Sequence, residues 1–504
     1  MLEATVHGAL EGLWLVLAWP NILYPVLGTL LAMLVAFVPG ISGATVMALM
    51  IPFTLAWEPL PVMLTFGGLV GGATFMGSIT AILFNVPGSG PSAATLIDGH
   101  PLAQQGQART AIGCAAMASA GGSTIGILIL VLLIPLMRQA IMAFGPPELL
   151  MLMIWGLTTI AVVTRGAVAR ALIAAGLGLL LAFIGQDART GELRFTFGWL
   201  YLWDGLGLIP VVLGLFSIAE MADLSVSGRL TISGKSRVEQ LSGSVREGVR
   251  SVFTHLGLFV RSALIGTAVG IIPGVGGTVA SFLAYGQAVQ TSSDRDRFGK
   301  GDIRGVIAPE AAHDAKDGGS LVPVLAFGIP GSEATAVLMA ALVLHGLVPG
   351  RVLMTDQLPL VFVLIWSLFL SNWITSILGV ALVGPLARLT TLRVQVLAPI
   401  VFALAVLGAF AYEQRFEDVG VALAFGIIGY LMKKHAWPRI PLVVALLLGG
   451  GIELNLRITA QLHALGRVDL WARPLLLVLV LLVLVNLALP WLRANSAARQ
   501  EPAS

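Results

Sequence analysis

The chain has 504 residues, of which 57% are hydrophobic and 11% are charged, and its net charge is +3. An ordinary globular protein has about 25% charged residues, so this composition excludes a chain made of several soluble domains. The 29 basic residues lie scattered, which excludes a nucleic-acid-binding surface, and a single cysteine, Cys114, excludes a disulfide framework. The mean hydropathy of +0.93 and the uncharged stretch 357–387 indicate a protein that crosses the membrane several times, because roughly 20 apolar residues span a bilayer.

Apolar runs predict an all-α polytopic membrane protein with about 12 membrane segments. The runs cover residues 21–38, 59–76, 110–137, 148–164, 167–184, 205–222, 252–272, 319–346, 358–385, 389–411, 418–432 and 474–492. The longest polar gap is basic, so the positive-inside rule predicts that it is cytoplasmic. The predicted organisation is an N-terminal membrane repeat (1–222), this basic cytoplasmic loop (223–250), a C-terminal membrane repeat (251–460) and a final membrane helix with a tail (461–504).

Four Pro-Gly breaks interrupt the apolar runs and form two related pairs. Residues 38–43 resemble 272–277, and residues 85–89 resemble 328–332, at similar spacing within each half. Two internal copies of one unit explain this order. Because only the second copy follows a basic loop, the two copies are predicted to have opposite orientations. Inverted repeats with Pro-Gly-broken helices or re-entrant hairpins are typical of secondary transporters.

Each break is also a candidate binding element. Proline removes a backbone donor and glycine accepts unusual dihedral angles, so a break exposes polar backbone that lipid tolerates only inside protein or beside a wet cavity. The helix that restarts after a break offers N–H groups to a carboxylate or phosphate, although a plain kink with serine caps would look similar. The candidate substrate-binding residues are Pro39, Gly40, Ser42, Gly43, Thr45, Asn85, Pro87, Gly88, Ser89, Ser92, Pro273, Gly274, Gly276, Thr278, Pro330, Gly331, Ser332 and Thr335.

Acidic residues stand close to the breaks of the second half. Glu310, Asp314 and Asp317 share one helical face, with Lys316 on its flank. This stretch is either a solvated amphipathic helix or a face that lines the cavity and helps to couple an ion. Glu333 follows the fourth break and is either a cation site or a first-turn glutamate that favours the helix dipole. The coupling-ion candidates are therefore Glu310, Asp314 and Glu333.

At these motifs the sequence resembles the TctA family, the large membrane subunit of the tripartite tricarboxylate transporters. The first half carries Gly-Ser-Ile-Thr-Ala-Ile-Leu-Phe-Asn-Val-Pro-Gly at 77–88 and Asp-Gly-His-Pro at 98–101. The second half is similar to the family at residues 272–276, 298–301, 308–310 and 328–332. The chain departs from the residues usual in the family at Ser42, Met76, Ile79, His313 and Asp314.

The resemblance implies a permease rather than an enzyme. Its expected activity is secondary, ion-gradient-driven uptake (symport) of di- or tricarboxylates, citrate being the namesake, across the bacterial inner membrane. The coupling ion would be Na+ or H+, with no other cofactor and no metal. The expected partners are a small membrane subunit similar to TctB and a periplasmic solute-binding protein similar to TctC. An anion channel and an intramembrane enzyme are the alternatives, although the sequence lacks His-Glu-x-x-His and Gly-x-Ser-x-Gly motifs.

Overall fold

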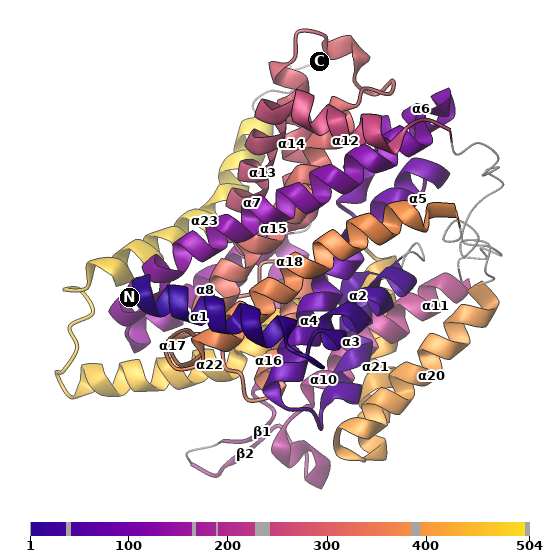
Figure 1. Ribbon diagram of the computed structural model, residues 1–504. Coiled ribbons are helices and arrows are strands. Elements are labelled where there is room, and N and C mark those ends of the chain that lie inside the picture. The colour runs from indigo at the N-terminus through magenta and orange to yellow at the C-terminus, as the bar shows by residue number, and fades with distance from the viewer. Residues whose placement is uncertain are drawn as a thin grey trace.

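The structure is a computed structural model and is almost entirely helical (Figure 1). It describes residues 2–36, 42–163, 168–187, 190–226, 242–384 and 394–498. Two predicted site residues, Pro39 and Gly40, lie outside the described residues, as does the middle of the predicted cytoplasmic loop. The all-α membrane class predicted from the sequence is confirmed.

The elements follow one another through short connections, with η denoting a 3-10 or π turn. The chain begins with α1 (Leu2–Leu17), α2 (Leu23–Ala36), α3 (Gly43–Thr54), α4 (Pro59–Thr74), α5 (Met76–Phe84), α6 (Ser92–Leu102), η1 (Ala103–Gln107) and α7 (Ala108–Ala143). It continues with α8 (Pro146–Val163), α9 (Val168–Ala182), β1 (Gly185–Gln186), β2 (Leu193–Arg194), η2 (Leu200–Asp204), α10 (Leu208–Val212), η3 (Leu213–Ile218) and α11 (Ala219–Val226).

The second half forms a comparable series of helices. It contains α12 (Val245–Thr254), α13 (Leu256–Ile271), α14 (Gly276–Thr291), η4 (Arg295–Arg297), α15 (Arg304–Phe327), α16 (Glu333–Leu344), α17 (Arg351–Thr355) and α18 (Leu358–Ala381). The chain ends with α20 (Val394–Glu413), α21 (Phe416–Lys434), α22 (Ile440–Ala464) and α23 (Pro474–Ala498).

Membrane-spanning helices can be identified by length and composition. Among the described residues, five helices are long and apolar enough to cross a membrane, or six if α12 and α13, which bend by 81°, form one span. Shorter apolar helices such as α2, α3 and α16 accompany them. The number of about twelve segments therefore stays a prediction. One span, α22, was absent from the predicted runs because Glu453 and Arg457 interrupt its apolar pattern.

The contacts of the two predicted repeats correspond to one another. Helix α2 packs on α4 as α13 packs on α15, and α4 packs on α18 as α15 packs on α7. The short helices after the breaks cross over between the halves, because α3 contacts α16 and α6 contacts α14. In Figure 1, α3 and α16 lie in the lower part of the molecule and α6 and α14 in the upper part. Two copies of one unit would give this correspondence, and their opposite orientation in the membrane stays a prediction.

The second and fourth breaks also share a backbone conformation. Asn85 caps the C-terminal end of α5 and Gly328 that of α15, and both residues are left-handed, with φ of 57° and 65°. Glycine and asparagine adopt this conformation with the least strain, and it stops a helix. A Pro-Gly dipeptide follows in each case, and the new helices begin at Ser92 and Glu333.

Helix α15 is enclosed by other helices. A methyl group on Gly318 of α15 would overlap the backbone of Gly126 in α7, and one on Gly266 of α13 would overlap the backbone of Ala312 in α15. Small residues at such contacts let helices approach closely in membrane proteins. The polar stretch 310–317 is buried as a consequence.

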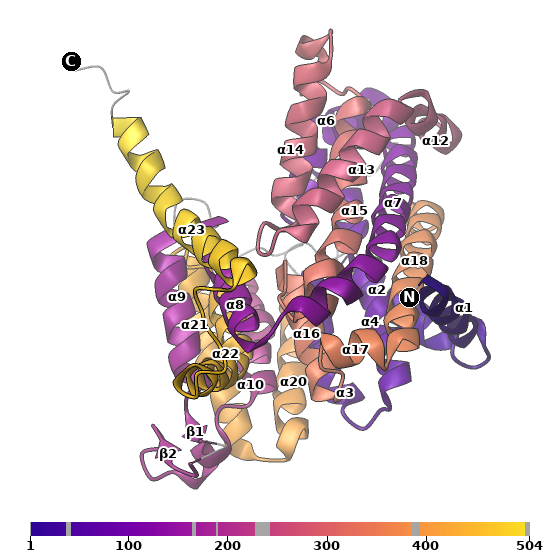
Figure 2. The same ribbon diagram turned by 90° about the vertical axis from the view of Figure 1, so that its left-hand side faces the viewer.

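A second group of helices stands beside this assembly. Helices α8, α9, α21, α22 and α23 lie on one side of Figure 2, and α1, α2, α4, α7, α15 and α18 lie on the other. The main cluster of buried apolar side chains joins the two groups through α3, α4, η3, α16, α18 and α20. The hairpin of β1 and β2, which pairs Gly185 with Arg194, projects from the lower end.

Candidate functional site

A cavity of about 390 Å³ brings all four breaks together. Its volume lies within the range of about 300–1,000 Å³ that is typical of small-molecule pockets. Residues from both repeats line it: Ser42, Gly43, Ala44, Met47, Val70, Ala73, Thr74, Ser89, Gly90, Pro91, Gly274, Val275, Gly276, Gly277, Thr278, His313, Lys316, Asp317, Ser332, Glu333, Ala334 and Ile440. The described parts of the four breaks, each a candidate binding element in the sequence, therefore lie around one space.

In the first repeat, serines hold the backbone where the helices restart. Ser42 caps α3 because its Oγ accepts a hydrogen bond from Thr45 N at 3.3 Å. After the second break, Ser92 Oγ accepts from Ser89 N at 3.0 Å and donates to Ser89 O at 2.8 Å. Ser42 and Ser89 line the cavity, whereas Thr45 and Ser92 are buried behind them and fix the turns.

In the second repeat, the two breaks are joined directly. Gly274 N donates to Gly331 O at 3.0 Å. Gly274 and Gly276 have φ of 79° and 71°, a conformation that favours glycine. Ser332 and Thr335 form a reciprocal capping box at the start of α16, so Ser332 stands at the cavity wall with its backbone fixed.

The cavity contains a lysine side chain from α15. Lys316 and the adjacent Asp317 are buried, line the cavity and form an ion pair with each other. His313, one turn earlier, also lines the cavity, and its Nδ1 has no hydrogen-bond partner among the described residues. The alternative that residues 310–317 form a solvated helix is therefore wrong, because every residue of this stretch is buried. The cavity consequently combines hydroxyl groups and one ammonium with the carboxyl groups of Asp317 and Glu333.

The three coupling-ion candidates occupy different places. Glu310 accepts from Ser78 Oγ at 2.6 Å and from Thr95 Oγ1, in α5 and α6, and does not line the cavity. Asp314 accepts from Ser119 Oγ in α7 and is also behind the wall. In each of these two carboxylates one oxygen has no partner among the described residues.

Glu333 differs from them because it lines the cavity in the first turn of α16, where a carboxylate also favours the helix dipole. No group of three His, Cys, Asp or Glu side chains in the described part of the chain could hold a metal ion.

Several predicted site residues support the cavity without lining it. Gly88 N donates to Gly77 O at 3.2 Å, and a Cβ on Gly88 would lie 2.5 Å from Gly77 Cα, so Gly88 packs against α5. The other predicted residues that do not line the cavity are Thr45, Asn85, Pro87, Ser92, Pro273, Pro330, Gly331 and Thr335. Their role here is to shape the backbone of the breaks.

Two sequence motifs that carried the family resemblance meet at Asp98 in α6. Its Oδ1 accepts from Gly299 N, Gly301 N and Asp302 N at 2.8, 2.9 and 2.9 Å. Its Oδ2 accepts from Tyr285 Oη at 2.9 Å. Asp98 is fully buried, so a single carboxylate of the first repeat holds the connection between α14 and α15 of the second.

Asp302 in this connection has a second interaction, with Arg304. Arg304 Nη2 lies 2.7 Å from Asp302 Oδ2, and Arg304 N donates to Asp302 Oδ1 at 3.0 Å. Burial raises the pKa of Asp302, but the hydrogen bonds and positive charge of Arg304 outweigh it and hold the pKa below its ordinary value.

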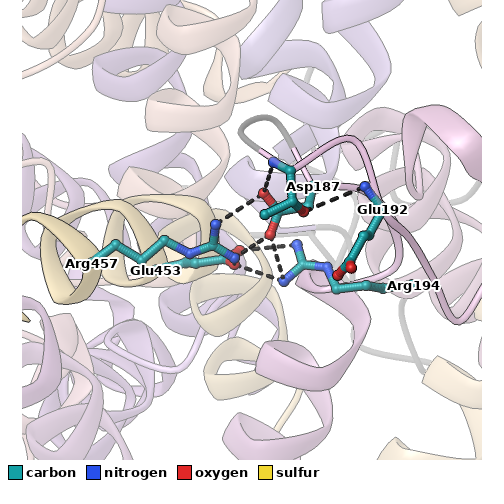
Figure 3. A network of polar contacts seen from close by, with 6 residues as sticks. Asp187, Glu192, Arg194, Glu453 and Arg457 are labelled. Atoms are coloured by element: carbon teal, nitrogen blue, oxygen red, sulfur yellow. Dashed lines mark hydrogen bonds and ion pairs between the residues drawn. The ribbon is translucent and has the colours of Figure 1, made fainter.

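A separate network of charges docks the hairpin onto α22 (Figure 3). Arg194 donates to both carboxylate oxygens of Glu453, at 2.6 and 3.1 Å, and Arg457 Nη1 donates to Asp187 Oδ1 at 2.9 Å. The bidentate hydrogen bond to Glu453 raises the pKa of Arg194 above its ordinary value. None of these residues lines the cavity, so the network fixes the outer helices relative to the hairpin.

Part of the cavity wall was not predicted from the sequence. Thr74 and Ile440 were not among the predicted site residues, and Lys316 was predicted to lie on the flank of the acidic face. One signal was available for Lys316, because α15 carries small residues such as Ala311, Ala312 and Gly318 that indicate close helix packing.

Comparisons with known proteins agree with the predicted family. The family profile described as "Tripartite tricarboxylate transporter TctA family" matches residues 22–444. A relative from Agrobacterium vitis, "Uncharacterized 52.8 kDa protein in TAR-I ttuC' 3'region", is 32% identical over 437 residues, 87% of this chain and 86% of the relative. Another from the same organism, "Uncharacterized protein in TAR-II ttuC' 3'region", is 31% identical over 192 residues, 38% of this chain and 79% of that protein. No solved structure matches the chain.

Proposed function

The chain belongs to the tripartite tricarboxylate transporter TctA family, and we propose that it is a permease that carries di- or tricarboxylates through the cavity between its four breaks. Family membership makes it a membrane component of a transporter with other subunits. The observation that carries the proposal is the convergence of broken helices from both halves on one cavity that contains Lys316.

The cavity has the chemistry that a carboxylate requires. The ammonium of Lys316 supplies the opposite charge, and the hydroxyls of Ser42, Ser89 and Ser332 supply donors. The N-terminal turns of α3 and α16 add the positive ends of two helix dipoles. Citrate, malate and succinate are the first substrates to test, because each offers carboxylates within one small molecule.

Uptake in this proposal is driven by an ion gradient. Glu310 and Asp314 each keep one buried carboxylate oxygen without a partner among the described residues, and Glu333 faces the cavity. Buried carboxylates inside a membrane protein mark cation or proton sites, so Na+ or H+ is the proposed coupling ion. The proposed partners are a TctB-like membrane subunit and a TctC-like solute-binding protein, and the proposed location is the bacterial inner membrane.

Counterflow in proteoliposomes tests the proposal. The purified chain is reconstituted, alone and together with any membrane subunit and solute-binding protein that co-purify, in vesicles loaded with unlabelled citrate, malate or succinate. A carrier concentrates external labelled substrate transiently above its equilibrium level, whereas a channel gives equilibration without this overshoot. Overshoot with one of these acids supports carboxylate transport. If none of them gives overshoot in either preparation, the proposed function is wrong.

A further inference from the structure

The ion pair in the cavity has an unusual geometry. Lys316 and Asp317 are consecutive in α15, and consecutive helical residues point about 100° apart and do not face one another. The pair therefore exists because the long lysine side chain bends around the helix toward Asp317. Both side chains are buried, and both reach the cavity.

The surroundings leave Lys316 with few other charged partners. It is the one lysine or arginine among the described lining residues. His313 of its own helix and Glu333 of α16 are the other ionisable groups on the wall, whereas α4 and α14 contribute the hydroxyls of Thr74 and Thr278. Helix α13 packs against the backbone of Lys316 and contributes no lining residue. The two further acids of α15, described above, accept hydrogen bonds from α5, α6 and α7 instead.

One oxygen of Asp317 is available for another ligand. Its Oδ1 contacts Lys316 Nζ, the Thr74 hydroxyl of α4 also interacts with this carboxylate, and its Oδ2 is buried without a hydrogen bond of normal geometry among the described residues. A buried carboxylate is stable when it is paired, protonated or bound to a cation, and removing its partner leaves a costly unpaired charge. Whatever takes Lys316 away from Asp317 must therefore be accompanied by a cation.

We propose that Asp317 is the counter-ion of Lys316 before the substrate binds, and that a carboxylate of the substrate displaces it. This inference rests on the proposed function and specifies how the cavity selects its ligand. When the substrate carboxylate pairs with Lys316, Asp317 receives one proton or one Na+ from solution. The positive charge of that cation balances the charge that the carboxylate brings. Substrate and cation therefore enter together. Lys316 determines the selectivity for anions, and Asp317 determines the coupling of transport to the cation.

Two single variants separate these roles. Lys316→Met removes the ammonium but keeps the length of the side chain, so counterflow is expected to slow by about thirtyfold or more. Asp317→Asn removes the carboxylate that competes with the substrate for Lys316, so counterflow is still expected, but at an altered rate. Its rate is expected to lose the dependence on external pH or Na+ that the wild type shows, and accumulation driven by an ion gradient is expected to disappear.

The controls use two further variants. The double variant Lys316→Met/Asp317→Asn removes both members of the pair and so leaves neither unpaired, and it is expected to reach the membrane at wild-type levels and to transport as slowly as Lys316→Met. Lys434→Met changes an exposed lysine at the end of α21 and is expected to behave as the wild type.

Three results would overturn the inference: wild-type counterflow in Lys316→Met, unchanged cation dependence in Asp317→Asn, or complete loss of counterflow in Asp317→Asn. Each of them leaves the proposed function standing if the wild type still shows overshoot. If a single variant does not reach the membrane, Lys316→Gln and Asp317→Ser take its place under the same criteria. Absence of overshoot in the wild type counts instead against the proposed function.

Discussion

The carboxylate of Asp98 is expected to contribute strongly to the stability of the folded chain. It is fully buried and accepts three backbone hydrogen bonds and one from Tyr285, all at 2.8–2.9 Å. Hydrogen bonds to a charged group contribute about 1.5–3 kcal/mol each, against about 0.5–1.5 kcal/mol for neutral pairs. Asp98→Ala removes the acceptor and leaves three amides unpaired, so it is expected to lower the free energy of unfolding by roughly 5 kcal/mol. Asp98→Asn keeps an acceptor but loses the charge, so it is expected to lower the free energy of unfolding by roughly 3 kcal/mol.

Thermal unfolding of the purified protein in detergent measures this effect. Tyr285→Phe removes one of the four hydrogen bonds and is expected to lower the free energy of unfolding by about 1.5–3 kcal/mol. The expected order of apparent Tm is therefore wild type, Tyr285→Phe, Asp98→Asn and Asp98→Ala. Asp296→Ala changes an exposed aspartate in the same connection and serves as the matched control. If Asp98→Ala melts at the temperature of Asp296→Ala, the carboxylate does not hold the two repeats together.

Three smaller predictions concern the cavity and its surroundings. Gly277→Val is expected to abolish counterflow, because its side chain would enter the cavity beside Lys316, where a Cβ would lie 2.9 Å from Lys316 Cε. The protein should still reach the membrane, because that part of the lysine side chain is flexible and can move aside. Normal counterflow would contradict the location of the site. Ser332→Ala removes a helix cap and one donor, so it is expected to slow counterflow about fivefold, equivalent to about 1 kcal/mol, and a loss as complete as that of Gly277→Val would be too large for one hydroxyl. Asp302→Asn is expected to lower the apparent Tm at pH 7. Because Arg304 holds the pKa of Asp302 below its ordinary value, the gap to the wild type should shrink below about pH 4, and a gap that widens there would contradict the assigned direction.

The breaks could be predicted from the sequence because their signal is local. A Pro-Gly dipeptide inside an apolar run strongly disfavours a continuous helix, because proline removes a backbone donor and glycine adds conformational freedom. The pairing of the breaks also agrees with the structure, since Asn85 and Gly328 end their helices in the same left-handed conformation. The motif at each break consists of residues that are neighbours in the chain, so each break can be recognised without knowing what packs against it.

The burial of Lys316 could not be predicted in the same way. Its charged neighbours make the stretch resemble a solvated helix, and the residues that enclose it belong to α7 and α13, far away in sequence. A partner distant in sequence also explains why α22 was missed. Glu453 and Arg457 interrupt its apolar pattern, and they are paired by Arg194 and Asp187 of a hairpin about 260 residues earlier.

A structure of the protein determined with a transported carboxylate bound tests the central claim most directly. We expect the ligand in the cavity, with a carboxylate oxygen within hydrogen-bonding distance of Lys316 Nζ and with Asp317 turned away from that ammonium. Ser42 and Ser332, from the two repeats, should face the same molecule. Another polar pocket, lined by residues that include Gln105 and Arg297, lies near the connection between α14 and α15. A carboxylate bound there, with the cavity between the breaks empty at saturating ligand, would contradict the assignment of the site.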